Sequence, residues 1–114
     1  MDIFLIITSV IFALTVHEAG HILGIIMTRA GKVQGMVACW KGIGVKWEPY
    51  AYEPLKRSIV SLSGSAVNLA FAAAFYGAGL EVLGMVNLVF GVINLLPLPN
   101  SDGLRALNNL RALV

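Results

Sequence analysis

Hydrophobic residues along this chain form three long runs separated by shorter polar segments. The first run covers residues 3–27, the second about 58–80 and the third about 82–96. A helix needs about 20 residues to cross a hydrocarbon core of about 30 Å. The first two runs reach this length, whereas the third is short and ends at Pro97 and Pro99, where the helical hydrogen-bond ladder must break. The pattern predicts three transmembrane helices, the third broken near Pro97.

The polar segment after the first run predicts a β-hairpin. Glycines and apolar residues alternate with charged residues over residues 32–48, and Lys41-Gly42 is a plausible turn. Because alternating runs on either side of a turn are typical of paired strands, we expect residues 32–39 to pair with residues 43–48. The predicted fold class is therefore an all-α integral membrane protein with one small β-hairpin between its first two helices.

The segment after the two prolines predicts a further short helix. Leucines and a valine recur at helical spacing over residues 103–114, as in a half-buried or amphipathic helix. Asn100, Ser101 and Asp102 precede this segment, and the side chain of each can cap a helix N-terminus. Asp102 therefore has a structural interpretation, as a cap, beside the chemical one developed below.

Composition agrees with a membrane location. Hydrophobic residues make up 58% of the 114 residues, charged residues 12%, and the mean hydropathy is +0.83, whereas about a quarter of the residues of a soluble domain are charged. The length suits a single intramembrane core over residues 1–114. Nothing resembles a nucleic-acid-binding patch, so no nucleic acid partner is expected. Cys39 is the only cysteine, which excludes an internal disulfide and favours a small packed strand residue.

The distribution of charge predicts a topology. All eight lysines and arginines lie either within residues 29–57 or after the third run, and the opposite side carries only Asp2 and Glu81. Cytoplasmic loops of membrane proteins carry the excess of basic residues. We therefore expect a multi-pass protein of the inner-membrane type, with its N-terminus outside and its hairpin and C-terminus in the cytoplasm.

The chain's two histidines both lie in His17-Glu18-Ala19-Gly20-His21, inside the first hydrophobic run. Ionisable residues within a membrane span are costly and indicate a functional site. On a helix, this H-E-x-x-H pattern places two imidazoles on one face with a carboxylate beside them, which is the arrangement of zinc hydrolases. The alternative, a histidine pair that only hydrogen-bonds neighbouring helices, does not explain the adjacent carboxylate.

A catalytic zinc ion usually takes three protein ligands and keeps one position open for water. At about 1.5 Å of rise per residue from the outer ends of their spans, His17 lies roughly 22 Å deep, His21 roughly 28 Å and Asp102 at most about 31 Å. The other carboxylates lie at the outer face or in the polar loop. Depth therefore favours Asp102 as the third ligand of one Zn²⁺ ion in the cytoplasmic half of the bilayer, and Glu18 remains as general base toward a zinc-activated water.

Three motifs, taken in order, resemble the site-2 protease family of intramembrane zinc metalloproteases. The first is the H-E-x-x-H pentapeptide. The second, Asn94-Leu95-Leu96-Pro97-Leu98-Pro99-Asn100-Ser101-Asp102-Gly103, is similar to the family's N-x-x-P-x-P-x-L-D-G, with Ser101 where leucine is usual. The third, Gly64-Ser65-Ala66-Val67-Asn68, is similar to G-P-x-x-N with serine in place of proline. The resemblance covers essentially the whole chain.

The resemblance implies roles for single residues. It implies that His17, His21 and Asp102 bind zinc, that Glu18 is the catalytic base, and that Asn94 helps to hold the substrate or the developing oxyanion. An interhelical hydrogen bond is the structural alternative for Asn94. For Asn68 we favour a packing role.

The resemblance also implies that the hairpin lies beside the active site. A hairpin edge can capture an unwound substrate as an added strand, and the residues assigned to this contact are Val37, Trp40 and Val45, together with Asn94. An ordinary cytoplasmic hairpin is the alternative.

The expected function is cleavage of transmembrane segments of membrane proteins by a zinc endopeptidase embedded in the lipid bilayer. Two alternatives stay open: a catalytically silent zinc-containing membrane protein that binds transmembrane or extended peptide segments, and a metal carrier. Retention of Glu18 argues against the first, and the lack of a second polar site for conduction argues against the carrier. A homo-oligomer or a regulatory membrane partner is compatible with so short a chain.

Overall fold

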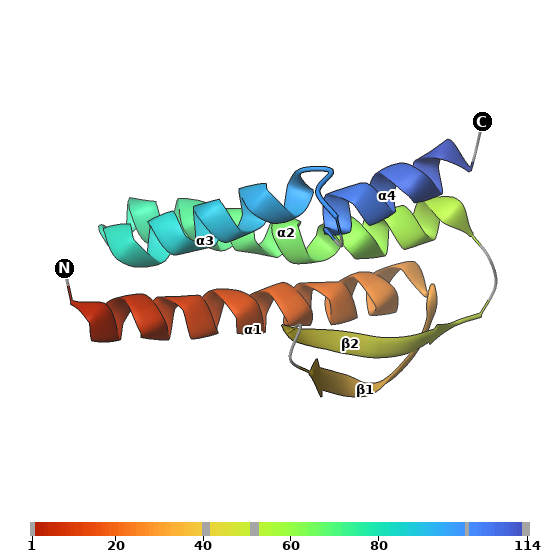
Figure 1. Cartoon of the computed structure of the whole chain (residues 1–114), viewed down its shortest axis with the longest axis horizontal. Coiled ribbons are helices and arrows are strands. Elements are labelled where there is room, and N and C mark those ends of the chain that lie inside the picture. The colour runs from red at the N-terminus through yellow and green to blue at the C-terminus, as the bar shows by residue number, and fades with distance from the viewer. Residues whose placement is uncertain (1, 40–41, 51–52, 100, 113–114) are drawn as a thin grey trace.

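The computed structural model describes residues 2–39, 42–50, 53–99 and 101–112. These residues form four helices and a two-stranded antiparallel sheet, which confirms the predicted mostly helical fold with one hairpin. The elements in chain order are α1 (Ile3–Thr28), β1 (Gly31–Cys39), β2 (Gly42–Pro49), α2 (Pro54–Gly77), α3 (Glu81–Leu95) and α4 (Asp102–Arg111). Helices α1 and α2 run along most of the molecule, and α3 and α4 follow one another along α2 (Figure 1).

Helix α1 is the longest element, and both of its ends are capped. The Asp2 side chain accepts a hydrogen bond from the Phe4 backbone N–H at 2.8 Å, which satisfies one of the free donors of the first turn. Arg29 adopts the left-handed conformation with φ of 55° and ends the helix. Its 26 residues span about 39 Å at about 1.5 Å per residue, more than the hydrocarbon core of a bilayer requires.

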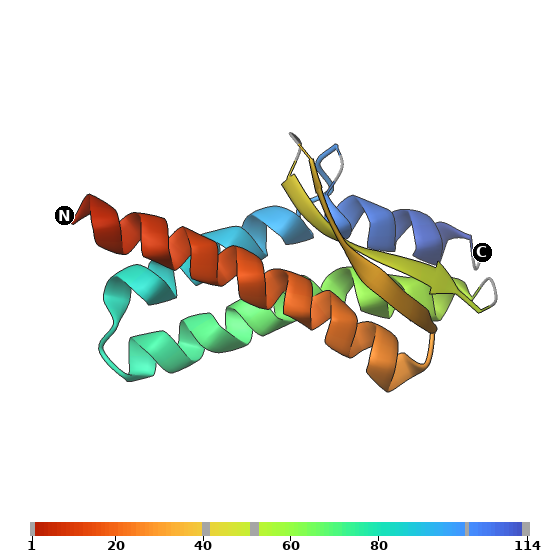
Figure 2. The same cartoon turned by 90° about the horizontal axis from the view of Figure 1, so that it is seen from below.

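The hairpin lies against the C-terminal half of α1 (Figures 1 and 2). Its strands pair from Gly31 opposite Pro49 to Cys39 opposite Gly42, close to the predicted ranges, with a register shift between Val33 and Gly35. One face of the hairpin packs on the helices: Val33, Val45 and Trp47 contact a buried cluster of Ile25, Ala30 and Val60. This packing ties the hairpin to the end of the α1–α2 pair.

Helix α2 begins at Pro54, four residues before the predicted start of its hydrophobic run. Proline suits the first turn because the N–H that it lacks has no partner within the helix there. The contact with α1 is close because glycines face each other: a Cβ on Gly20 would lie 2.8 Å from the Gly64 Cα. Small residues allow such approach between helices in a membrane.

The third predicted span is divided between two helices. Helix α3 has 15 residues, or about 22 Å, and it ends just before the prolines, as predicted. Helix α4 begins at Asp102 and ends at Arg111, near the predicted 103–114. Within the described residues, α1 and α2 are the helices long and apolar enough to cross a membrane. The expected third span is therefore not a continuous helix of that length.

Polar and small side chains are concentrated inside the helix bundle, and large apolar ones outside. Phe4 and Met27 of α1, for example, are 77% and 75% exposed. The buried polar and charged side chains are Ser9, His17, Glu18, Ser58, Ser65, Asn68, Asn87, Ser101 and Asp102. Exposed apolar surface of this extent is unusual for a soluble monomer.

Candidate metal centre

Three potential metal ligands from two helices converge inside the bundle. His17 Nε2 lies 2.8 Å from Asp102 Oδ2, His21 Nε2 lies 3.1 Å from the same oxygen, and the two Nε2 atoms are 3.1 Å apart. Ligand atoms on a tetrahedral zinc ion with bonds near 2.0–2.1 Å are about 3.3 Å from each other. The group His17, His21 and Asp102 can therefore hold a metal ion, and the ligands expected from the sequence lie together.

The chemistry of these atoms also fits a cation. His21 Nδ1 lies 2.8 Å from the Val60 carbonyl oxygen, which can only accept a hydrogen bond, so this nitrogen carries the proton. When the imidazole is neutral, the other ring nitrogen turns a lone pair toward Asp102 and His17. His17 and Asp102 are only 4% and 5% exposed, so little water is available to screen the repulsion between the lone pairs that meet here. A bound cation would remove this repulsion directly.

Because the chain breaks between α3 and α4, Asp102 lies at the start of α4, next to the histidines. Ser101 caps α4, because its Oγ accepts the Leu104 N–H at 3.1 Å while its own hydroxyl donates to the Leu96 carbonyl at 2.6 Å. The interpretation of Asp102 as the helix cap is therefore wrong, and its carboxylate is free for the site. Asn100, the third cap candidate, lies outside the described residues.

Gly103 lets the chain fold tightly at this break. A Cβ at this position would overlap the carbonyl group of Leu95 at the end of α3. Asp102 thus supplies a candidate metal ligand, and glycine is the residue type that fits next to it at position 103, against the Leu95 carbonyl group.

The two oxygens of Asp102 have different partners. Oδ2 faces the histidines, whereas Oδ1 accepts a hydrogen bond from Arg105 at 3.2 Å, one turn further along α4. Asp102 is thus a carboxylate with one oxygen available to a metal.

Gly64 of α2 makes room for the histidines. A Cβ there would lie 2.7 Å from the His17 carbonyl oxygen and 2.8 Å from His21 Nε2. The first of these is backbone that cannot move without moving α1, so a side chain at Gly64 would displace the helix that carries both imidazoles.

Glu18 is buried at the site without a fixed partner. It is 7% exposed, and its carboxylate forms no hydrogen bond within the part of the chain that the structure describes. A carboxylate that is not held by a hydrogen bond can exchange protons with a bound water. The predicted role of Glu18 as a base stays a prediction.

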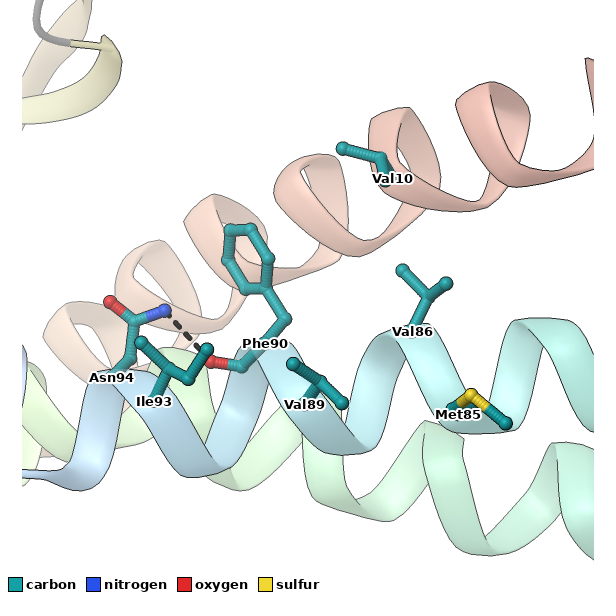
Figure 3. A pocket seen from close by; sticks show the side chains of 7 residues that line it. All are labelled: Val10, Met85, Val86, Val89, Phe90, Ile93 and Asn94. Atoms are coloured by element: carbon teal, nitrogen blue, oxygen red, sulfur yellow. Dashed lines mark hydrogen bonds between the residues drawn. The ribbon is translucent and has the colours of Figure 1, made fainter. Parts of the chain in front are cut away.

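Asn94 lies on α3, at one end of an apolar groove between α1 and α3 (Figure 3). Its Nδ2 donates to the Phe90 carbonyl of its own helix at 2.8 Å, and its amide forms no interhelical hydrogen bond with any residue that the structure describes. The groove has a volume of about 410 Å³ and is lined by Val10, Met85, Val86, Val89, Phe90, Ile93 and Asn94. The Phe90 ring stands edge-on to the His17 ring, with centroids 5.3 Å apart, so the groove reaches the metal ligands.

The expected substrate contacts of the hairpin do not share one face. Val37 is opposite Gly44 and is 47% exposed, whereas Val45 is opposite Met36 and packs inward on the helices. Neighbouring positions on a strand point to opposite faces, so Val45 packs partly on the helices, and the substrate contacts of Val37 and Val45 stay predictions. Trp40, the remaining residue of this set, lies outside the described residues.

Sequence reasoning missed one residue of the site and undervalued another. Asn68 Oδ1 lies 2.8 Å from His17 Nδ1, and Asn68 Nδ2 donates to Asn87 Oδ1 at 3.0 Å. Both amides are fully buried. The available signal was an amide side chain within an apolar run, which is costly unless it is paired.

The comparisons with known proteins add no relative. No protein-family model, curated protein or solved structure matches the chain.

Proposed function

We propose that this protein is an intramembrane zinc endopeptidase that cleaves transmembrane segments, as its motif resemblance to site-2 proteases implies. The observation that carries the proposal is the convergence of His17, His21 and Asp102 to within 3.1 Å of one another, with the buried Glu18 next in sequence to His17. Metal-assisted hydrolysis requires at least a metal ion that activates water and a nearby carboxylate that can act as the general base.

The bundle suits a bilayer as its solvent. Helices α1 and α2 are long and apolar enough to cross it, and their outward side chains are large and apolar. In our proposal α3 and α4 together form the third, broken span. Irregular backbone at membrane depth is tolerated where it lines a cavity, and the break lies beside the metal ligands. In the proposed orientation, which follows the positive-inside rule, the N-terminus lies outside and the C-terminus lies in the cytoplasm.

Zinc is the metal proposed, because two imidazoles and one carboxylate form a typical protein ligand set of a catalytic zinc ion. When bound, it supplies Lewis-acid activation of water and of the scissile carbonyl. The protein's own part in the reaction falls to Glu18, which takes a proton from the attacking water and passes it to the leaving amine. Asn94 is proposed to hydrogen-bond the substrate backbone or the developing oxyanion through its amide.

The apolar groove between α1 and α3 is the proposed path of the substrate. Its lining is apolar apart from Asn94, and one lining residue, Phe90, contacts the His17 ring. An apolar substrate segment fits this lining. The outer edge of β1, the strand that carries Val37, is not paired within the two-stranded sheet and is proposed to pair with an added substrate strand.

Glu18→Gln separates an enzyme from a zinc-binding relative. The chain is purified in detergent and incubated with a broad set of transmembrane substrates, with Glu81→Gln, an exposed glutamate of α3, as the matched control. Wild type and Glu81→Gln should cleave, and Glu18→Gln should keep its zinc but lose about 10²- to 10⁴-fold of the rate, the usual contribution of a general base.

Two outcomes contradict the peptidase proposal. Equal cleavage by wild type and Glu18→Gln would remove Glu18 as the base. A wild-type chain that binds zinc yet cleaves nothing in the set would instead be a catalytically silent membrane protein that binds transmembrane or extended peptide segments.

A further inference from the structure

We propose that Asn68 of α2 and Asn87 of α3 are positioning residues that fix the proton and the ring orientation of His17, so that its Nε2 faces the metal. The inference rests on the metal-binding part of the proposed function and is independent of peptide cleavage.

The two amides link three helices to one metal ligand. Asn87 Nδ2 donates to the Leu83 carbonyl at 2.9 Å, and Asn87 Oδ1 accepts from Asn68 Nδ2 at 3.0 Å. Asn68 Nδ2 also donates to the Ala13 carbonyl at 3.0 Å, and Asn68 Oδ1 lies 2.8 Å from His17 Nδ1. Both asparagines have 0% exposure, so no bulk water competes for these bonds.

Backbone carbonyls fix which atom is the donor and which the acceptor in each hydrogen bond of this network. Because a carbonyl oxygen only accepts, Leu83 and Ala13 each identify the NH₂ end of the amide that meets them. The remaining end of Asn68 is its oxygen, which also only accepts. His17 Nδ1 must therefore carry the proton that it donates to Asn68. In the neutral imidazole that metal binding requires, Nε2 then keeps its lone pair toward Asp102.

The two histidines both carry a proton on Nδ1, but different groups accept the hydrogen bond from it. His21 Nδ1 lies against the Val60 carbonyl of the backbone, which no side-chain substitution removes. His17 depends on the Asn68 side chain, and Asn68 in turn on Asn87. Hydrogen bonds from the outer nitrogen of a metal-binding histidine fix its tautomer and raise its basicity, and their loss typically weakens metal binding by about 10- to 100-fold.

A role as interhelical glue is the competing explanation, and Asn68→Asp distinguishes it from Asn68→Leu. Aspartate keeps an oxygen for His17 Nδ1 but loses the donors to Ala13 and Asn87. If Asn68 acts only through its bonds to Ala13 and Asn87, both variants lose these bonds and should behave alike. If Asn68 positions His17, aspartate should keep zinc binding and leucine should not.

The experiment measures zinc affinity by chelator competition and the visible absorption of the Co²⁺-loaded protein, on the full chain in detergent. We expect Asn68→Leu to weaken zinc by about 10- to 100-fold and to change the Co²⁺ spectrum, with Asn68→Asp near wild type. Asn87→Leu should have a smaller effect of the same sign. Ser65→Ala is the matched control, since the Ser65 hydroxyl is buried on α2 without a partner among the described residues, and it should leave both readouts unchanged.

Equal zinc affinity in wild type and Asn68→Leu would overturn the inference, as would equal losses in Asn68→Leu and Asn68→Asp. If the Asn68 variants do not fold, ¹⁵N imidazole spectra of the wild-type chain decide: His17 must be protonated at Nδ1, and protonation at Nε2 alone would overturn the inference. A wild type that binds neither zinc nor Co²⁺ would remove the inference together with the metal centre. A wild type that binds zinc but cleaves nothing would remove only the peptidase proposal.

Discussion

Helix α2 and the α3–α4 pair run along the same stretch of the bundle, but they contribute to the metal site in different ways: α2 leaves space for the histidines, and α4 supplies a carboxylate. Helix α2 passes the histidines unbroken and offers them a glycine, Gly64, whose missing side chain leaves room. The α3–α4 pair breaks at the same level, and the new helix starts with Asp102. An unbroken helix supplies space and hydrogen-bond acceptors, whereas the break points a carboxylate inward from a capped helix start.

Removal of the carboxylate should have the largest effect on this contrast. Asp102→Ala deletes the candidate metal ligand that the α3–α4 pair supplies. Zinc affinity should fall by more than the roughly 100-fold that is typical of a lost supporting hydrogen bond. Metal content after dialysis against a chelator measures this, with the exposed Asp2→Ala as control. Unchanged zinc content in Asp102→Ala would mean that another residue completes the site.

Filling the space on the unbroken helix should come next. Gly64→Ala places a Cβ against the His17 carbonyl, and such overpacking costs about 1–3 kcal/mol of unfolding free energy. Zinc affinity should fall as well, because α1 must shift. Gly77→Ala on the same helix is the control, since nothing lies within 4 Å of its Cβ position, and it should change stability by less than about 1 kcal/mol. Equal effects at the two glycines would refute the close contact.

Loss of the cap at the break should have the smallest effect. Ser101→Ala removes the hydroxyl that bonds Leu104 and Leu96, and the loss of an N-cap costs about 1 kcal/mol. Thermal unfolding in detergent measures it, and Ser101→Thr, which keeps a hydroxyl, should lose less. If alanine and threonine are equally stable, the cap does not hold the break together.

Much of this arrangement could be predicted from the sequence, because the decisive signals are local. The four-residue spacing of His17 and His21 defines one face of a helix, the prolines mark the break, and alternation marks the hairpin. The level of Asp102 followed from counting residues along two spans. Each of these inferences needs only the geometry of single elements.

The remainder depends on how elements meet. Ser101, Asn100 and Asp102 are equivalent as caps until the fold turns one of them inward. The sequence does not say which face of the hairpin docks on α1, so the packing of Val45 on the helices is visible only in the structure. Asn87 carries no motif, and its role exists only where α1, α2 and α3 come together.

The most direct test of the central claim is the zinc stoichiometry and ligand set of the purified wild-type chain, by metal analysis and X-ray absorption at the zinc edge. The account predicts one zinc ion per chain, bound by two imidazole nitrogens and a carboxylate oxygen, and its loss in His17→Ala. A wild-type chain that stays free of zinc in zinc-containing buffer, or zinc without imidazole ligands, would contradict it.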